Sequence, residues 1–236
     1  MIALTSISPK HINGDVQALA INSWTNLGLR VYSFNNANEI SILKDKYKNV
    51  TFIESISGEA KFGRPLVYLD TLLDFARSQE DTDICLINSD IILNDSWTLL
   101  PEVIEKLPHR ATIVKRRDFI NDINDNKVFE SGIDVFFIHK NYIDLIPRSE
   151  FAIGACWWDY HVPYSLMKAN IPVKFLREPF AFHRLHNTQY PMKEWEALGH
   201  EFKNLHSVRA RTIMQLNNII YAHIMDNVNY RFHLFC

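Results

Sequence analysis

A ten-residue stretch at positions 84–93 constrains the fold of this chain more than any other. It reads Ile-Cys-Leu-Ile-Asn-Ser-Asp-Ile-Ile-Leu: four apolar residues, a polar triplet and three further apolar residues. Because this pattern lacks the periodicity of an amphipathic helix, it predicts a buried strand that breaks at the triplet and then continues. A carboxylate between two such apolar runs is costly without a partner, so Asp90 must face a metal ion, another polar group or a cleft. In an open α/β sheet, that cleft lies at the carboxyl ends of the central strands.

The segments before this strand alternate between strand-like and helix-like patterns. Strands are expected over residues 2–7, 29–34 and 50–53, and helices from residue 13, over 39–47 and over 65–76. Such an alternation predicts an α/β fold in which right-handed helical crossovers join the strands of a mostly parallel sheet.

The second half of the chain has a different pattern. A helix is expected from residue 95, and strands over 111–116, 128–139 and 173–176. Further helices are expected over 142–147, from the segment 157–160 through 167, and over most of 193–227. No change of composition marks a boundary, so one domain is expected over residues 1–236. We divide it into a nucleotide-binding half (1–95), an acceptor half (96–190) and a C-terminal helical extension (191–236). The apolar residues between 208 and 225 indicate a helix packed on the core, and a homodimer contact there stays open.

Composition excludes several classes of protein. The 25 basic and 27 acidic residues leave a net charge of −2, so no basic field indicates a nucleic-acid partner. Cys85, Cys156 and Cys236 are odd in number and lack metal-type spacing, which fits a reducing, cytoplasmic compartment. No apolar run reaches transmembrane length, and residues 1–6 do not have the basic flank of a signal peptide.

Four segments carry polar or aromatic residues where a binding site is expected, and they fall at residues 87–90, 131–138, 157–160 and 182–186. Their order resembles that of nucleotide-sugar glycosyltransferases of the GT-A fold, of the family 2 type, over most of residues 1–190. The resemblance implies a Rossmann-like sheet and the transfer of a sugar from a nucleotide-diphosphate donor to the hydroxyl group of a saccharide or other acceptor. It leaves open whether the reaction inverts or retains the anomeric configuration.

The triplet Asn88-Ser89-Asp90 resembles the short acidic metal-binding motif of this family, with Asn88 in place of the first acid. The resemblance implies that Asp90, together with His183, holds Mn²⁺ or Mg²⁺ on the diphosphate of the donor. His183 is preferred over His186. The alternative is that Asp90 caps the next segment or pairs with Arg64.

The segment 157–160, Trp-Trp-Asp-Tyr, has the position from which inverting members of the family take their general base. Asp159 is therefore expected to be catalytic, and Trp158 to stack on a sugar. Two tryptophans beside a carboxyl group restrict water, which raises its pKa. The alternative is that Asp159 only favours a helix N-terminus while both tryptophans are in the core.

The resemblance also assigns residues to the donor site. They are Thr5, Ser6, Asn35, Arg64, Asn88, Ser89, Asp134 and Trp158. Gly132 precedes Asp134, and its missing side chain would let the backbone pass close to the donor sugar. The alternatives are a bulge before a core strand at Gly132 and a solvated loop arginine at Arg64.

Three other functions compete with this one. A plain dinucleotide-binding protein is disfavoured, because no Gly-x-Gly-x-x-Gly turn follows the first strand. The missing first acid at Asn88 would also fit a catalytically inactive sugar- or nucleotide-binding homologue. A nucleotidyltransferase would be expected to carry a glycine-rich, basic loop after the first strand, and Ser-Ile-Ser-Pro-Lys at 6–10 is not such a loop.

Overall fold

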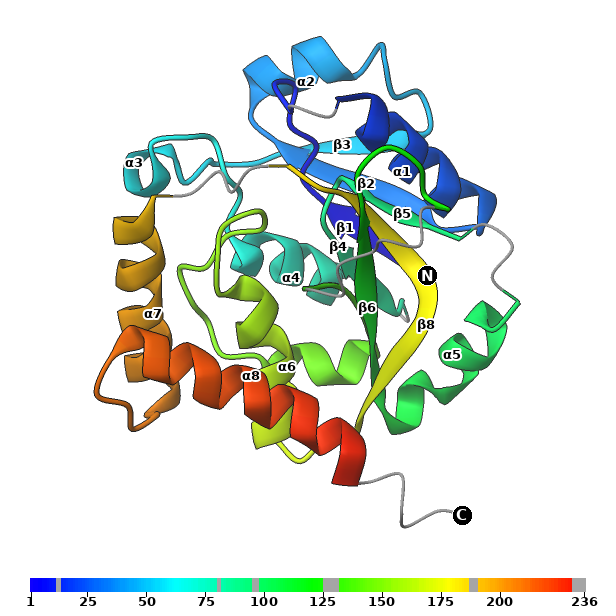
Figure 1. The fold of residues 1–236 in the computed structure, drawn as a ribbon. Coiled ribbons are helices and arrows are strands. Elements are labelled where there is room, and N and C mark those ends of the chain that lie inside the picture. The colour runs from blue at the N-terminus through cyan, green and yellow to red at the C-terminus, as the bar shows by residue number, and fades with distance from the viewer. Residues whose placement is uncertain (12–13, 80–81, 95–97, 125–131, 187–190, 231–236) are drawn as a thin grey trace.

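A central sheet of eight strands organises the chain in the computed structural model (Figure 1). The structure describes residues 1–236 except 12–13, 80–81, 95–97, 125–131, 187–190 and 231–236. The strand order is β3-β2-β1-β4-β7-β6-β8-β5. The predicted α/β class and the mostly parallel central sheet flanked by helices are confirmed.

The strands and helices have the following bounds. The strands are β1 (Ile2–Thr5), β2 (Arg30–Asn35), β3 (Val50–Glu54), β4 (Ile84–Ile87), β5 (Ile91–Leu93), β6 (Ala111–Phe119), β7 (Ile133–Ile138) and β8 (Val173–Arg184). The α-helices are α1 (Gly14–Asn26), α2 (Ala37–Leu43), α3 (Glu59–Phe62), α4 (Leu69–Ser78), α5 (Leu100–Lys106), α6 (Trp158–Lys168), α7 (Met192–His206) and α8 (Ile213–Tyr230). Two 3₁₀ helices, η1 (Leu107–His109) and η2 (Lys140–Leu145), complete the set that the described residues form.

The sheet has a parallel part and a mixed part. β3, β2, β1 and β4 are parallel neighbours, as the strand–helix alternation predicts. β7 then pairs antiparallel with both β4 and β6, while β6 and β8 are parallel and shift register between Val114 and Arg116. All four parallel strands of the first part therefore direct their carboxyl ends to the same edge.

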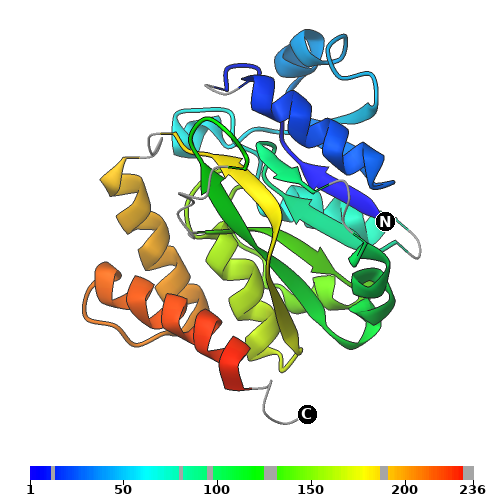
Figure 2. The same ribbon diagram turned by 45° about the vertical axis from the view of Figure 1, so that its right-hand side comes forward.

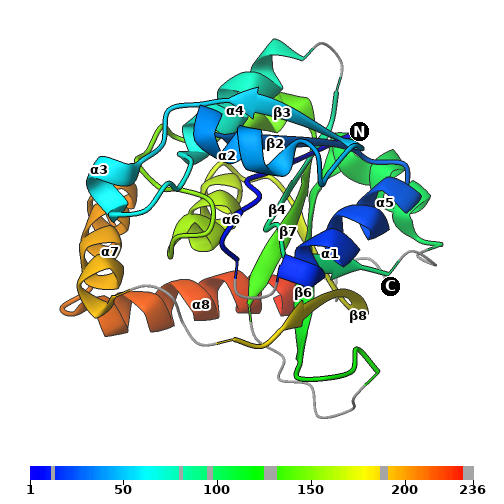
Figure 3. The ribbon, with the colours of Figure 1, turned by 90° about the horizontal axis from the view of Figure 1, so that it is seen from above.

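Each face of the sheet carries its own apolar core. Along β4, Ile84 and Leu86 contribute to one core, and Cys85 and Ile87 to the other, as the two-residue period of a strand requires. Helices α4, α6, α7 and α8 cover the first face, and α1, α2 and α5 cover the second. Figure 3 shows α6 and α7 on one side of the strands and α1 and α5 on the other.

The stretch at 84–93 breaks as predicted. β4 ends at Ile87, and β5 begins after the triplet at Ile91 and pairs antiparallel with β8 at the far edge of the sheet. The indole Nε1 of Trp24 donates to the carbonyl oxygen of Ile91 (2.8 Å), which ties α1 to the strand after the break. The polar triplet therefore lies where the chain changes direction.

Several sequence-based expectations differ from the structure. The helix expected from Pro65 begins at Leu69, because Val67 and Tyr68 instead form isolated bridges with Ser57 and Ala152. The loop before it contains the short helix α3, and the strand expected over 173–176 continues to Arg184 as β8. The strand expected from residue 128 is described only from Ile133, and the helix start expected at 95–97 lies outside the described residues.

The C-terminal helices pack on the sheet face that α6 covers (Figure 2). Ile213, Leu216, Ile220 and Ile224 of α8 are buried at helical spacing, so the predicted packing of this helix on the core is confirmed. Within the described ranges, no helix is both long and apolar enough to cross a lipid bilayer.

Candidate functional site

A cavity of about 570 Å³ lies at the carboxyl ends of the parallel strands. Its volume falls in the range of about 300–1,000 Å³ typical of small-molecule sites. The loop after β1, the break between β4 and β5, the start of β7, the first turn of α6 and the turn after β8 form its wall. Of the predicted site residues, the wall contains Ser6, Arg64, Asn88, Ser89, Asp90, Asp134, Trp158, Asp159 and His183.

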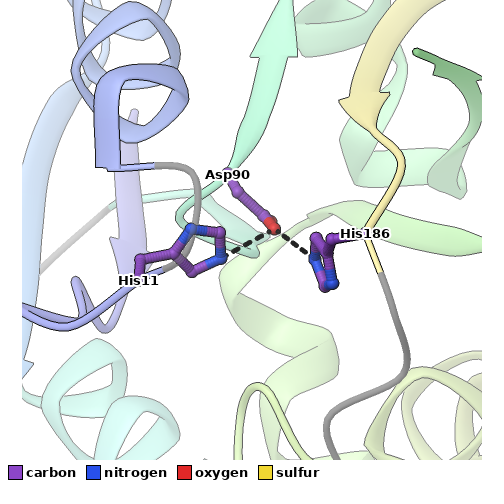
Figure 4. Close-up of side chains that lie close together, drawn as sticks. All are labelled: His11, Asp90 and His186. Atoms are coloured by element: carbon purple, nitrogen blue, oxygen red, sulfur yellow. Dashed lines mark hydrogen bonds and ion pairs between the residues drawn. The ribbon is translucent and has the colours of Figure 1, made fainter.

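Asp90 is surrounded by three histidines in this cavity. Its Oδ2 atom lies 3.2 Å from Nε2 of His11, 3.3 Å from Nε2 of His183 and 3.4 Å from Nε2 of His186. Figure 4 shows His11 and His186 approaching the carboxylate from opposite sides. Residues from the loop after β1, the break after β4 and the end of β8 therefore meet at one oxygen atom.

These contacts fix the charge of Asp90. Burial alone would raise the pKa of the Asp90 carboxyl, but hydrogen bonds from His11, His183 and His186 hold it well below its ordinary value. The side chain of Asp90 is therefore an anion at neutral pH, buried in the wall of the cavity.

His183 is oriented from behind by a second carboxylate. Its Nδ1 atom lies 2.9 Å from Oδ1 of Asp118, which is 1% exposed, and the same oxygen accepts from Nε of Arg116 (3.0 Å). Burial opposes a charged His183, yet the hydrogen bonds to Asp118 and Asp90 outweigh it and raise the pKa of His183 to about 9. Asp118 thus turns Nε2 of His183 toward Asp90.

Arg116 also joins the Asp90 region to Asp134. Its guanidinium donates to Oδ2 of Asp134 (2.6 Å), and Nδ2 of Asn88 donates to Oδ1 of the same carboxylate (2.7 Å). Gly132 has φ +89°, and a Cβ atom there would lie 2.8 Å from Nε of Arg116. Arg116 therefore packs against Gly132, which also lines the cavity.

Asp159 lies in the first turn of α6, where its Oδ1 accepts from the backbone N–H of Tyr160 (3.1 Å). Burial and the nearby charge of Asp134 raise the pKa of Asp159 to about 7, against the opposing effect of Arg116. Trp157 precedes α6 with φ +74°, a left-handed conformation that is rare for a bulky residue. This strained turn directs Asp159 toward the cavity, whose wall it joins.

The two tryptophans of this segment are mainly core residues. Trp158 is 1% exposed and packs edge-to-face on Phe136, with ring centroids 5.3 Å apart. Trp157 is 2% exposed, and its Nε1 donates to the carbonyl oxygen of Trp195 (2.9 Å). Both border the cavity, but neither presents an open ring face of the size that sugar stacking needs.

Some of the residues predicted to hold the nucleotide line the cavity, and others only support the residues that line it. Thr5 and Asn35 are fully buried and do not line the cavity. The Asn35 amide donates to the carbonyl oxygen of Ile7 (2.8 Å) and to Oε2 of Glu39 (3.0 Å). Asn35 therefore positions Glu39, a largely buried carboxylate in the wall, whose pKa burial raises.

Two further predicted residues lie in the wall with partners of their own. The hydroxyl group of Ser89 hydrogen-bonds the side-chain amide of Gln17 (2.8 Å). Arg64 forms a two-pronged ion pair with Glu194 near the start of α7 (2.8 and 2.7 Å). The alternative in which Arg64 pairs with Asp90 is not observed, because α7 supplies its carboxylate.

Comparison with known proteins adds a likeness to solved structures. No family model matches the sequence, and no curated protein matches it. Among solved structures, the chain is similar to a putative glucose-1-phosphate thymidylyltransferase from Bacillus anthracis in complex with a sucrose. The identity is 9%, the match covers 75% of this chain and 87% of that chain, and the TM-score is 0.46. Because identity and TM-score are both low, the activity of this chain has to be inferred from its own site.

The groups around Asp90 fit a divalent cation. His11, Asp90 and His186 each offer a ligand atom, and these atoms all lie within 4.8 Å of one another. A carboxylate oxygen and imidazole nitrogens are ligands that divalent transition metals accept. These three residues could therefore hold such an ion, with His183 against the same carboxylate oxygen.

Sequence reasoning found Asp90 and His183 but did not single out His11, Glu39, Arg116 or Asp118, which also line the cavity. His11 is a lone histidine in a loop, and only the fold brings it beside Asp90, 79 positions later in the sequence. Glu39 lies four residues beyond the end of β2, inside α2, so its position gave no motif. His186 was considered and ranked below His183, although both approach Asp90.

Proposed function

We propose that this protein is a glycosyltransferase that moves a sugar from a nucleotide-diphosphate donor to a hydroxyl acceptor. One observation carries the proposal: a single cavity holds both the histidine-surrounded Asp90 and, in its wall, an acid whose pKa is about 7. The first group suits a cation that faces a diphosphate, and the second suits proton transfer near neutral pH.

The donor would lie along the strand ends. Ser6 and Ser8 offer hydroxyl groups at the end of β1, and the buried Glu39 offers a carboxylate to the ribose diol. The diphosphate would face Asp90 and its histidines. A divalent cation bound there would neutralise the negative charge that develops on the leaving nucleoside diphosphate.

The acceptor would approach from the side of α6. Asp159 would take the proton of its hydroxyl group as that oxygen attacks the anomeric carbon, so the reaction would invert configuration. Burial raises the pKa of Asp159 most, and the charges of Asp134 and Arg116 shift it further in opposite directions. The bulky Trp157 and Trp158 limit the access of water to this part of the cavity.

Product analysis tests the proposal. The protein is incubated with a panel of nucleotide sugars, simple saccharide acceptors and Mn²⁺ or Mg²⁺, and release of nucleoside diphosphate is measured. Asp159→Asn should lower turnover by about 10²–10⁴-fold while donor binding changes little. In a parallel incubation with nucleoside triphosphates and sugar phosphates, release of pyrophosphate would instead show nucleotidyl transfer. Donor binding without any product would show an inactive homologue.

A further inference from the structure

We infer that His11, Asp90 and His186, with His183 against the same carboxylate oxygen, form a site that selects transition-metal ions, with Zn²⁺ and Co²⁺ ahead of Mn²⁺, over Mg²⁺ and Ca²⁺. The inference rests on the proposed function in one respect: the ion bound at Asp90 would contact the diphosphate of the donor. The identity of the ion, however, follows from the ligands themselves.

The chemistry of the ligands favours such ions. Three of the four side chains offer imidazole nitrogen, and only Asp90 offers oxygen. Mg²⁺ and Ca²⁺ are hard cations that take oxygen ligands, and Mg²⁺ keeps several of its waters. Imidazole suits zinc and neighbouring transition metals, whose affinity for nitrogen sites rises from Mn²⁺ through Co²⁺. A shell with three histidines therefore discriminates against the hard ions.

The spacing of the ligand atoms fits one ion. Oδ2 of Asp90 lies 3.2–3.4 Å from Nε2 of His11, His183 and His186, and the Nε2 atoms of His183 and His186 are 3.2 Å apart. Neighbouring ligand atoms on one ion with bonds of about 2.1 Å lie about 3.0–3.4 Å apart. His11, Asp90 and His186 thus already lie close enough together to share an ion, and His183 lies against Asp90 and His186 beside them.

The surroundings of the site support the same assignment. Asp118 holds Nδ1 of His183 at 2.9 Å, which leaves Nε2 as the atom that faces Asp90. A carboxylate on the far nitrogen of a ligand histidine is the usual support of such sites. Asp118 is 1% exposed and is itself paired with Arg116, so this support is rigid.

An ion at this position would join three distant segments. His11 comes from the loop after β1, Asp90 from the break after β4, and His183 and His186 from the end of β8 and the turn after it. Because the unfolded chain does not hold these residues together, binding of the ion also stabilises the fold.

Metal titration of the chelator-treated protein tests the inference. Affinities for Zn²⁺, Co²⁺, Mn²⁺, Mg²⁺ and Ca²⁺ are measured by calorimetry and by the rise of the melting temperature, and bound Co²⁺ is followed by its visible absorption. We expect Zn²⁺ and Co²⁺ to bind at least 100-fold more tightly than Mg²⁺. His11→Ala and His186→Ala should each weaken Zn²⁺ binding at least tenfold, and Asp118→Asn by about 10–100-fold.

The exposed histidines His109 and His200 provide matched controls, and His109→Ala and His200→Ala should leave Zn²⁺ binding unchanged. Circular dichroism confirms that each variant is folded, and His11→Asn replaces His11→Ala if the alanine variant is not. Equal affinities for Mg²⁺ and Zn²⁺, or tight Zn²⁺ binding by a folded His11 variant, would overturn the inference. Selective Zn²⁺ binding without release of nucleoside diphosphate would support the metal site and count against the glycosyltransferase. Sugar transfer without selective Zn²⁺ binding would support the glycosyltransferase and count against the metal-site inference.

Discussion

At the scale of single residues, the account depends on how neighbours set the charge of Asp159. Burial is the largest effect that raises its pKa, and the carboxylate of Asp134 on β7 adds to it. Arg116 on β6 and the backbone N–H groups of Asp159 and Tyr160 act in the opposite direction. An acid balanced in this way changes charge near neutral pH, which is the range in which a general base is most effective.

This balance predicts the pH dependence of transfer. A base with a pKa of about 7 is protonated and inactive in acid, so kcat/KM should rise with pH up to about 7 and then level off. Asp134→Asn removes a negative neighbour, lowers the pKa of Asp159 and should move the rise to lower pH. A pH–rate profile of both proteins checks this, and an unchanged midpoint in the variant would contradict the electrostatic argument.

Gly132 allows a second prediction at this scale. An alanine Cβ there would lie 2.8 Å from Nε and 2.9 Å from Cζ of Arg116, in a backbone conformation with φ +89°. Gly28 also has a positive φ (+80°), but no atom lies within 4 Å of a Cβ added there. Gly28→Ala should therefore lower the free energy of unfolding only by the cost of a left-handed alanine, about 1–2 kcal/mol. Urea unfolding should show Gly132→Ala to be less stable than Gly28→Ala. Equal losses would mean that Arg116 is free to move aside.

At the scale of secondary-structure elements, α6 and α7 are joined by a buried pair of histidines. Nδ1 of His161 lies 2.9 Å from Nε2 of His206, and Nε2 of His161 lies 3.2 Å from the carbonyl oxygen of Pro147. Burial lowers the pKa of His161 to about 3 and that of His206 to about 4. Both side chains are therefore neutral in the folded protein at neutral pH.

These shifts predict a loss of stability in weak acid. Below pH 6.5 the unfolded state binds protons at these histidines before the folded state does, so the free energy of unfolding falls as pH falls toward 4. His161 alone should contribute a loss of about 2 kcal/mol between pH 6.5 and pH 5. Urea unfolding at both pH values should show a smaller loss for His206→Gln than for the exposed control His200→Gln, and equal losses would exclude the pair as the cause.

At the scale of the whole molecule, the architecture was largely predictable from the sequence, and the site only in part. The break at 88–90 and the alternation before it follow from local periodicity, and both predictions are confirmed. The helix start at Leu69 was missed because residues 67 and 68 are held by bridges to distant segments. In the same way, His11 and Glu39 join the site only through the topology of the sheet.

The partners of the predicted residues were also beyond local reasoning. Nothing near Arg64 in the sequence shows that Glu194, 130 residues later, takes both of its hydrogen bonds. Trp158 follows a strained turn whose geometry buries the ring. Sequence patterns identified which residues lie near the cavity, and the three-dimensional packing decides which of them have side chains available to a ligand.

The central claim is that a cation at Asp90 fixes a diphosphate in the cavity. The most direct test is calorimetric titration of the chelator-treated protein with a panel of nucleoside diphosphates, with and without Zn²⁺, Mn²⁺ or Mg²⁺. Asp90→Asn, which keeps the shape of the side chain and removes its charge, is titrated in parallel. The account predicts that a transition-metal ion increases the affinity for one of these nucleotides at least tenfold in the unmodified protein and not in Asp90→Asn. Equal affinity with and without the ions, or an undiminished effect of the ions in Asp90→Asn, would contradict it.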